Sequence, residues 1–250
     1  MAHRILILGG TTEARELAAR LAQRADLAIT LSLAGRTANP VAQPVPVRVG
    51  GFGGTEGLAR YLAAERIALL IDATHPFAAR ISANATAAAK ASAVSLLTLR
   101  RPEWKPVAGD DWTLTDTIPQ AVVALGSEPK AVFVTLGRQE LKPLEAAPQH
   151  RYVIRSVDPV EPRVAVPRAE YILDRGPFAE DRERALLERL GVEVVVSKNS
   201  GGSAAYAKLA AARSLGVPVI LVRRPPVAGK AVENVDATVD AVAHLLPPAA

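Results

Sequence analysis

Short apolar runs alternate with longer stretches rich in Ala, Leu, Glu and Arg along this chain, and no other feature constrains its fold as strongly. Runs such as residues 5–8 and 67–71 have the length of strands, and the stretches between them have the length and composition of helices. A strand, a helix and a second strand form the βα unit from which parallel sheets are built. The alternation therefore predicts an α/β fold with parallel sheets.

The first half of the chain divides into strands and helices of ordinary length. We expect strands near residues 4–8, 27–32, 67–71, 94–99 and 112–115, and helices near residues 12–24, 56–65, 77–91 and 118–126.

The second half repeats this order. Phe52 and Phe178 lie 126 residues apart, and so do Asp72 and Lys198, which close the apolar strands that follow. Further along the chain the offset between matching residues falls to 123 and then to 120. Changes in loop length produce such a drift in an old duplication, and chance similarity among Ala-, Val- and Leu-rich segments is the alternative.

A duplication predicts two Rossmann-like parallel-sheet halves, residues 1–126 and 127–250, with a ligand cleft between them. Open α/β sheets bind ligands outside the carboxyl ends of their strands, so functional residues are expected in the loops there. Duplicated halves can also exchange their closing strand and helix, and the sequence leaves this choice open. It gives no indication of the oligomeric state.

The composition predicts a soluble, cytoplasmic protein that binds anions. No apolar run approaches the roughly 20 residues that span a bilayer, and glycines end the first run before a secretory signal could form. The chain has no cysteine, which excludes disulfides and thiolate metal sites. The net charge of +5 favours anionic ligands, whereas dispersed basic residues and an aromatic content of 4% argue against nucleic acid.

The first candidate loop contains Gly9, Gly10, Thr11 and Thr12, between the first strand and the next helix. Glycines let the backbone approach a ligand, and the N–H groups of a helix start attract phosphate. The loop lacks the third glycine of G-x-G-x-x-G, and Glu13 adds a carboxylate to the first helical turn. We expect a nucleotide contact here, and a tight turn capped by threonine is the alternative.

The end of the second strand indicates which dinucleotide binds. NAD sites place an acidic residue about 20 residues beyond the glycines, whereas an Arg accommodates the 2′-phosphate of NADP. This chain has no carboxylate between Ser32 and Arg36, so we expect NADPH, with Arg36 at its 2′-phosphate; a solvated surface Arg is the alternative. A second glycine-rich loop, around Phe52 and Gly53, is expected to close over the ligand, with Phe52 either contacting it or packing internally.

Polar residues follow the third expected strand of the first half. Asp72, Thr74 and His75 stand at the carboxyl end of the strand near residues 67–71. Asp72 and His75 are candidate proton donors, and Thr74 is a candidate for a cofactor contact or a helix cap. A lone His without Cys or a second His at ligand spacing does not indicate a metal, so no metal site is expected.

The equivalent loop of the second half combines a charge with glycines. It contains Lys198, Asn199, Ser200 and Gly201 ahead of a helix, where an anion can contact both an ammonium group and exposed amides. We expect Lys198 to bind substrate and to be a candidate proton source. Asn199, Ser200 and Gly201 are expected to contact the cofactor.

Three arginines stand at other strand ends of the second half: Arg138, Arg155 and Arg175. The matching positions of the first half are mostly Gly, Ser and Thr. We therefore expect the first half to hold the dinucleotide and the second to offer a basic face to an acidic substrate. A rim of solvated arginines is the alternative, because loops are exposed in any case.

Four strings occur in order along the chain: ILGGTTEAREL, VGGFGG, DATHPFA and VSKNSGG. Together they resemble the precorrin-6A reductase family over essentially the whole chain. The resemblance implies NADPH-dependent reduction of the tetrapyrrole precorrin-6A to precorrin-6B in cobalamin (vitamin B12) biosynthesis, with a hydride delivered to the ring and a proton to the adjacent carbon. It also implies an acidic substrate that the basic side chains of the second half attract, and it leaves open whether the ring carries cobalt.

Two other functions fit a two-lobed chain with anion-binding loops. A transferase would bind a nucleotide-linked donor, such as a sugar nucleotide, or S-adenosylmethionine in place of NADPH. A non-enzymatic sensor would close around a small anion. Thermal-shift screening separates the first from a reductase, and the sensor would not oxidise NADPH with any tetrapyrrole.

Overall fold

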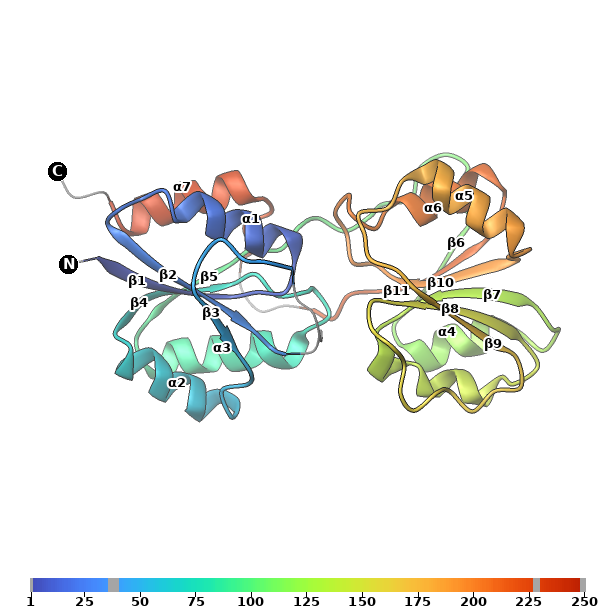
Figure 1. Ribbon diagram of the computed structural model, residues 1–250, viewed down its shortest axis with the longest axis horizontal. Coiled ribbons are helices and arrows are strands. Elements are labelled where there is room, and N and C mark those ends of the chain that lie inside the picture. The colour runs from blue at the N-terminus through green and yellow to red at the C-terminus, as the bar shows by residue number, and fades with distance from the viewer. Residues whose placement is uncertain (1, 36–40, 227–229, 248–250) are drawn as a thin grey trace. The chain divides into compact units, whose positions relative to one another are not determined.

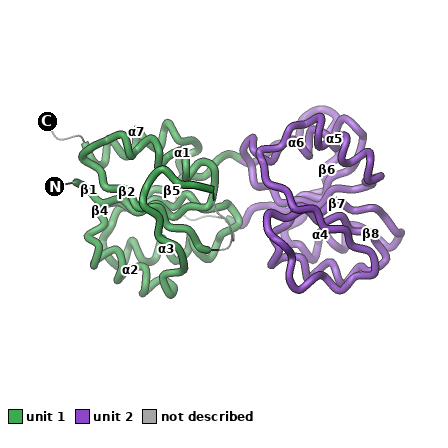
Figure 2. Tube along the Cα trace, in the orientation of Figure 1, with its two compact units in different colours: residues 1–102, 226–250 green, residues 103–225 purple. Residues whose placement is uncertain are grey.

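The structure, a computed structural model, describes residues 2–35, 41–226 and 230–247. It divides into two compact units: unit 1 contains Met1–Pro102 and Pro226–Ala250, and unit 2 contains Glu103–Pro225 (Figure 2). Each unit is a parallel sheet with helices on both faces, which confirms the predicted fold class (Figure 1). No helix among the described residues is long and apolar enough to cross a membrane.

The sheet of unit 1 has the strand order β3-β2-β1-β4-β5. Helices α1 and α7 cover one face, and α2 and α3 cover the other (Figure 1). The strands are β1 (His3–Leu8), β2 (Leu27–Leu33), β3 (Val47–Val49), β4 (Ile67–Asp72) and β5 (Ser95–Thr98), and the helices are α1 (Thr12–Leu21), α2 (Gly54–Ala64), α3 (Ala79–Ala91) and α7 (Val235–Leu245).

The sheet of unit 2 has the order β9-β8-β7-β10-β11-β6, which repeats the order of unit 1 and adds a sixth strand. Helices α5 and α6 lie on one face and α4 on the other (Figure 1). The strands are β6 (Trp112–Thr115), β7 (Ala131–Thr135), β8 (Arg151–Ser156), β9 (Ala169–Leu173), β10 (Val194–Lys198) and β11 (Val219–Val222); the helices are α4 (Ile118–Ala124), α5 (Glu180–Arg189) and α6 (Ala207–Ser214), with the 3-10 turns η1 (Arg138–Glu140) and η2 (Lys142–Ala146).

The central strand β1 shows why these apolar runs form buried parallel strands. Ile5 and Ile7 pack in the core beneath α1 and α7, whereas Leu6 and Leu8 pack in the core beneath α2 and α3. Successive side chains of a strand point to opposite faces, so an unbroken apolar run is stable only when helices cover both faces of the sheet. All four side chains are almost fully buried.

One strand of unit 1 was not predicted. β3 is three residues long and pairs with β2 at the sheet edge, where Val47 and Val49 are exposed. A short, exposed edge strand needs no apolar run, so the sequence pattern does not reveal it. The helix expected to begin near residue 77 begins at Ala79, because the Ala78 amide bonds to the His75 carbonyl in a preceding turn.

The division into residues 1–126 and 127–250 was wrong, because the two repeats exchange their closing elements. β6, from the first repeat, pairs in parallel with β11 of the second, with Trp112 opposite Val219. In return, Val232 pairs in parallel with Leu99 beyond the end of β5, and α7 packs against α1. The sequence repeat identifies both copies of each strand and helix, but it does not indicate in which sheet each copy lies. The exchange that the sequence left open therefore occurs.

Burial displaces two pKa values at the amino end of β8. His150 is fully buried and its Nδ1 accepts a hydrogen bond from the Lys130 amide. Burial, followed by the charge of Lys130, lowers the pKa of His150. Burial raises the pKa of Tyr152, which donates its hydroxyl proton to the Ala147 carbonyl oxygen, to about 12. Both groups are neutral parts of the core, at the opposite end of the strand from the functional loops.

The exchange of closing elements predicts which fragment of the chain folds. Residues 103–225 contain every strand of the second sheet and should unfold in one cooperative transition in urea, followed by circular dichroism. Residues 127–250 lack β6 and α4, whose Ala121, Val122 and Leu125 are buried in unit 2. That fragment should show a broad, non-cooperative transition. Equal cooperativity of the two fragments would contradict the exchange.

Candidate functional site

The loop after β1 combines an open glycine with a tightly held threonine. Gly10 has φ +112 and nothing near the position of a Cβ, whereas a Cβ on Gly9 would lie 2.6 Å from Leu31 Cδ1. Thr11 caps α1: its Oγ1 accepts from the Ala14 amide at 3.1 Å and donates to the Ala73 carbonyl at 2.9 Å. The threonine cap is thus present, and it fastens the loops after β1 and β4 together, while the Cβ position of Gly10 lies in open space among the described residues.

The missing third glycine has a structural substitute. Ala14 is fully buried at the position of that glycine, and its Cβ lies 3.4 Å from the position of a Cβ on Gly9. The third glycine of the fingerprint serves close packing of helix against strand, and alanine also meets that need. The spacing from Gly9 to Ala14 carries this signal in the sequence, although the same register places Thr11, and not Gly10, at the second glycine of the fingerprint.

The carboxylate in the first turn of α1 is neutralised. Glu13 Oε2 accepts a hydrogen bond from Arg101 Nη1 at 2.6 Å, and both side chains are largely buried. The expected repulsion between Glu13 and a phosphate is therefore offset by a cation supplied from the segment after β5. Sequence reasoning missed Arg101 as a site residue, because the residues are 88 positions apart.

The loop after β4 is held by its own side chains. Asp72 is buried, and its Oδ1 accepts from the Thr74 amide at 3.1 Å and from Thr74 Oγ1 at 2.7 Å. His75 Nδ1 accepts from the Phe77 amide at 3.3 Å. Asp72 and Thr74 thus hold this loop in one conformation. Among the residues that the structure describes, no cluster of His, Cys, Asp or Glu could hold a metal ion.

The glycine-rich loop before α2 is fastened by Arg48. Its guanidinium donates to the carbonyl oxygens of Gly50 and Gly51 at 2.5 and 2.9 Å, and lies 3.8 Å from the Phe52 ring centroid. Phe52 also packs edge-on against Tyr61, so its internal role is the one the structure shows. Gly53 is the N-cap of α2, with φ +81 and open space at its Cβ position. Arg36 lies outside the described residues.

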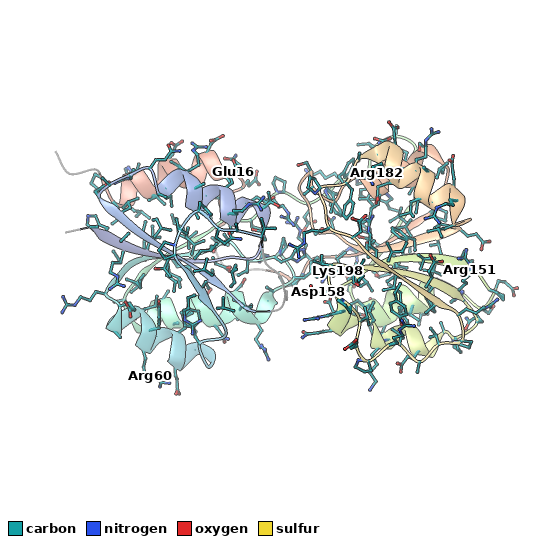
Figure 3. All side chains as sticks on the ribbon, in the orientation of Figure 1. Glu16, Arg60, Arg151, Asp158, Arg182 and Lys198 are labelled. Atoms are coloured by element: carbon teal, nitrogen blue, oxygen red, sulfur yellow. The ribbon has the colours of Figure 1, made fainter. Side chains whose placement is uncertain are left out.

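In unit 2, Lys198 lies at the carboxyl end of β10, and Arg151, at the start of β8, lies at the other end of the sheet (Figure 3). Lys198 Nζ donates to Glu140 Oε2 at 2.6 Å. The Ser200 amide donates to the Lys198 carbonyl, and Gly201 follows with φ +64. This loop therefore keeps the expected combination of a cation and a glycine turn.

Asn199 serves a structural role that was not predicted. Its Oδ1 accepts from the Trp104 amide at 2.9 Å, and its Nδ2 donates to the Trp104 carbonyl at 3.0 Å. The Trp104 indole donates to the Gly202 carbonyl at 2.7 Å. Both polar atoms of Asn199 thus bond to the Trp104 backbone inside unit 2, so this side chain fastens the segment before β6 to the end of β10. Trp104 was missed, although it is one of only two tryptophans in the chain.

Arg155 does not belong to an exposed basic face. It forms two hydrogen bonds with Glu183, of 2.6 and 2.8 Å, and both side chains are 4% exposed. Its guanidinium also lies 3.7 Å from the Phe178 ring centroid. Because α5 turns Glu183 towards β8, the charge of Arg155 is cancelled inside unit 2. Arg138 and Arg175 are exposed.

Known proteins resemble this chain over nearly its whole length. The family described as Precorrin-6x reductase CbiJ/CobK matches residues 4–244. The chain is 57% identical to Precorrin-6A reductase of Sinorhizobium sp over 98% of its own length and 95% of the relative's, and 50% identical to Precorrin-6A reductase of Rhodobacter capsulatus over 90% and 89%. A solved structure, CobK precorrin-6A reductase, is 46% identical with a TM-score of 0.93, covering 98% of this chain and 97% of that one. The chain therefore belongs to the precorrin-6x reductase family.

Proposed function

We propose that this chain reduces precorrin-6A to precorrin-6B with NADPH as the reductant. The reductase activity in cobalamin biosynthesis follows from the family. The observation that supports the cofactor is the edge of unit 1, where the Cβ position of Gly10 lies in open space among the described residues, just before α1 in a sheet of Rossmann strand order. The transferase and sensor alternatives have no comparable support.

The residues of unit 1 suit the diphosphate of a dinucleotide. Gly10 and Thr12 would present backbone at the start of α1, and Arg101 offsets the charge of Glu13 beside them. The Gly9 amide donates to the Ser32 carbonyl, so Gly9 would serve by allowing the backbone to turn towards the ligand. Gly53 would contact the same ligand from the start of α2, and Arg36 would hold the 2′-phosphate. Bound NADPH supplies the hydride, while the protein provides orientation and electrostatics.

The reduction also needs a proton for the carbon adjacent to the one that receives the hydride. Asp72 is poorly placed to reach a substrate, because it is buried and its Oδ1 is held by the amide and hydroxyl of Thr74. His75, Lys198 and water are the candidates that fit. Thr74 would then act mainly to hold the loop in which His75 stands.

The acidic macrocycle would bind at the carboxyl edge of unit 2. Lys198, Arg138 and Arg175 are the cations we assign to it, whereas Ser200 and Gly201 shape the loop around Lys198. The two relatives above are named for precorrin-6A without cobalt. We therefore propose the metal-free ring as the substrate.

Gly10→Ala should weaken NADPH binding by about tenfold or more, because a methyl group covers the amide face and one charge-assisted hydrogen bond is worth about 1.5–3 kcal/mol. Fluorescence titration with NADPH measures the effect. Gly191→Ala is the matched control, because Gly191 also has positive φ and open space but lies in unit 2 after α5. NADPH binding by the Gly10 variant equal to that of the parent would place the dinucleotide elsewhere.

Arg138→Ala and Arg175→Ala should each raise KM for precorrin-6A by up to about fivefold, the range expected for an exposed ion pair. The effect should shrink when the Debye length falls from about 30 Å at 0.01 M salt to about 3 Å at 1 M. Arg189→Ala, an exposed charge in the last turn of α5, is the control. If all three replacements changed KM equally, the assignment of a basic substrate-binding face to Arg138 and Arg175 would be wrong.

The replacement Arg155→Ala should instead lower the free energy of unfolding of unit 2 by about 3–5 kcal/mol, because it leaves Glu183 buried without its partner. The double replacement Arg155→Met with Glu183→Leu should restore most of that loss. Urea denaturation of the three proteins measures the difference. If the Arg155→Ala protein were as stable as the parent and had a raised, salt-dependent KM for precorrin-6A, Arg155 would instead bind the substrate, as the sequence predicted.

A further inference from the structure

Lys198 and Glu140 form an ion pair at the edge where we place the substrate. β7 and β10 are neighbouring parallel strands, with Thr135 opposite Ser197, so the residues that follow them meet at one edge of the sheet. Lys198 closes β10, and Glu140 closes the turn η1 after β7. Their side chains are 13% and 34% exposed, so solvent and solutes reach the carboxylate more easily than the ammonium group.

The turn η1, together with the Gly137 that precedes it, positions the carboxylate of Glu140. Its Oε2, the atom that contacts Lys198, also accepts from the Gly137 amide at 3.0 Å, and the Glu140 amide donates to the Gly137 carbonyl at 2.8 Å. A Cβ on Gly137 would lie 2.6 Å from that oxygen, so this arrangement requires glycine. The carboxylate is therefore placed by a short exposed turn, in contrast to the buried pair of Arg155 and Glu183.

We propose that Glu140 is a residue that sets substrate affinity: its carboxylate pairs with Lys198 and is exchanged for a side-chain carboxylate of the macrocycle when the substrate binds. This inference rests on the proposed function, which places the acidic substrate at Lys198. The exchange replaces one carboxylate by another at the same ammonium group, so the charge of Lys198 is never left uncompensated.

The exchange selects the chemical class of the substrate. An ionised carboxylate can replace Glu140, whereas a neutral amide or ester would leave Lys198 with its internal partner and gain little. The enzyme then prefers macrocycles whose acid side chains are still unmodified. Reactions that amidate those side chains would follow this reduction in the sequence of steps.

Glu140→Gln tests the proposal, because it removes the competing charge and keeps an oxygen for the Gly137 amide. KM for precorrin-6A should fall by about two- to fivefold, the value of a partly exposed ion pair. The preference for the free acid over its methyl ester should also widen, because the acid no longer competes with Glu140 for Lys198, whereas the ester gains only a neutral hydrogen bond. Glu145→Gln is the matched control: it removes the same charge from the next turn, where Glu145 accepts only the Ala165 amide among the described residues.

Gly137→Ala provides a second variant with the charge of Glu140 retained. The added methyl group pushes the carboxylate away from Lys198, so KM should fall in this protein as well. Thermal unfolding of each variant checks that unit 2 is folded. An unchanged or raised KM in both folded variants would overturn the role of Glu140.

Lys198→Ala separates this proposal from the proposed function. A raised KM that Glu140→Gln no longer lowers in the double variant supports both. A raised KM in Lys198→Ala together with no effect of Glu140→Gln overturns the exchange and leaves the substrate edge intact. An unchanged KM in Lys198→Ala overturns the placement of the substrate, and the exchange with it.

Discussion

Parallel strand pairing between the two repeats is the constraint on which the rest of the structure depends. A parallel strand at the edge of a sheet leaves a row of backbone groups without partners, and here each repeat supplies backbone that pairs at the other's edge: the strand β6 in unit 2 and an isolated bridge at Val232 in unit 1. Trp112 pairs with Val219 in unit 2, and Val232 pairs with Leu99 in unit 1. The chain therefore leaves each sheet at the carboxyl ends of β5 and β11, close in sequence to the candidate loops. Arg101 and Trp104, on the segment after β5, are bonded to Glu13 and Asn199 for this reason.

The charges at the two functional edges are balanced within each unit. Glu13 is paired with Arg101, Lys198 with Glu140, and Arg155 with Glu183. These pairs differ in burial, and burial decides what each can do. The Arg155 pair is fully withdrawn from water and can only stabilise, because separating it would leave a buried charge. The Lys198 pair is partly exposed, so its partner can be exchanged at low cost.

Most strands and helices could be predicted from the sequence, because short local stretches of residues determine them. The apolar run of β1 and the glycines that follow it determine a strand and a turn with little help from the rest of the chain. Partners distant in sequence were not predictable in the same way. Nothing local shows that Glu183 neutralises Arg155 or that Trp104 occupies both polar atoms of Asn199, since these contacts depend on which strands are neighbours. The boundary at residue 126 failed for the same reason.

The two units share one topology, and a few positions distinguish the ligands that we propose for them. Asp72 and Lys198 end equivalent strands, β4 and β10. The carboxylate of Asp72 turns back onto Thr74 within its own loop, which leaves that edge to glycines and backbone amides. The longer side chain of Lys198 reaches across to the neighbouring strand's turn and meets Glu140. An edge of uncovered amides suits a phosphate chain, whereas an edge with an exchangeable cation suits a carboxylate. The opposite charges at this one equivalent position therefore account for the assignment of the dinucleotide to unit 1 and of the acidic ring to unit 2.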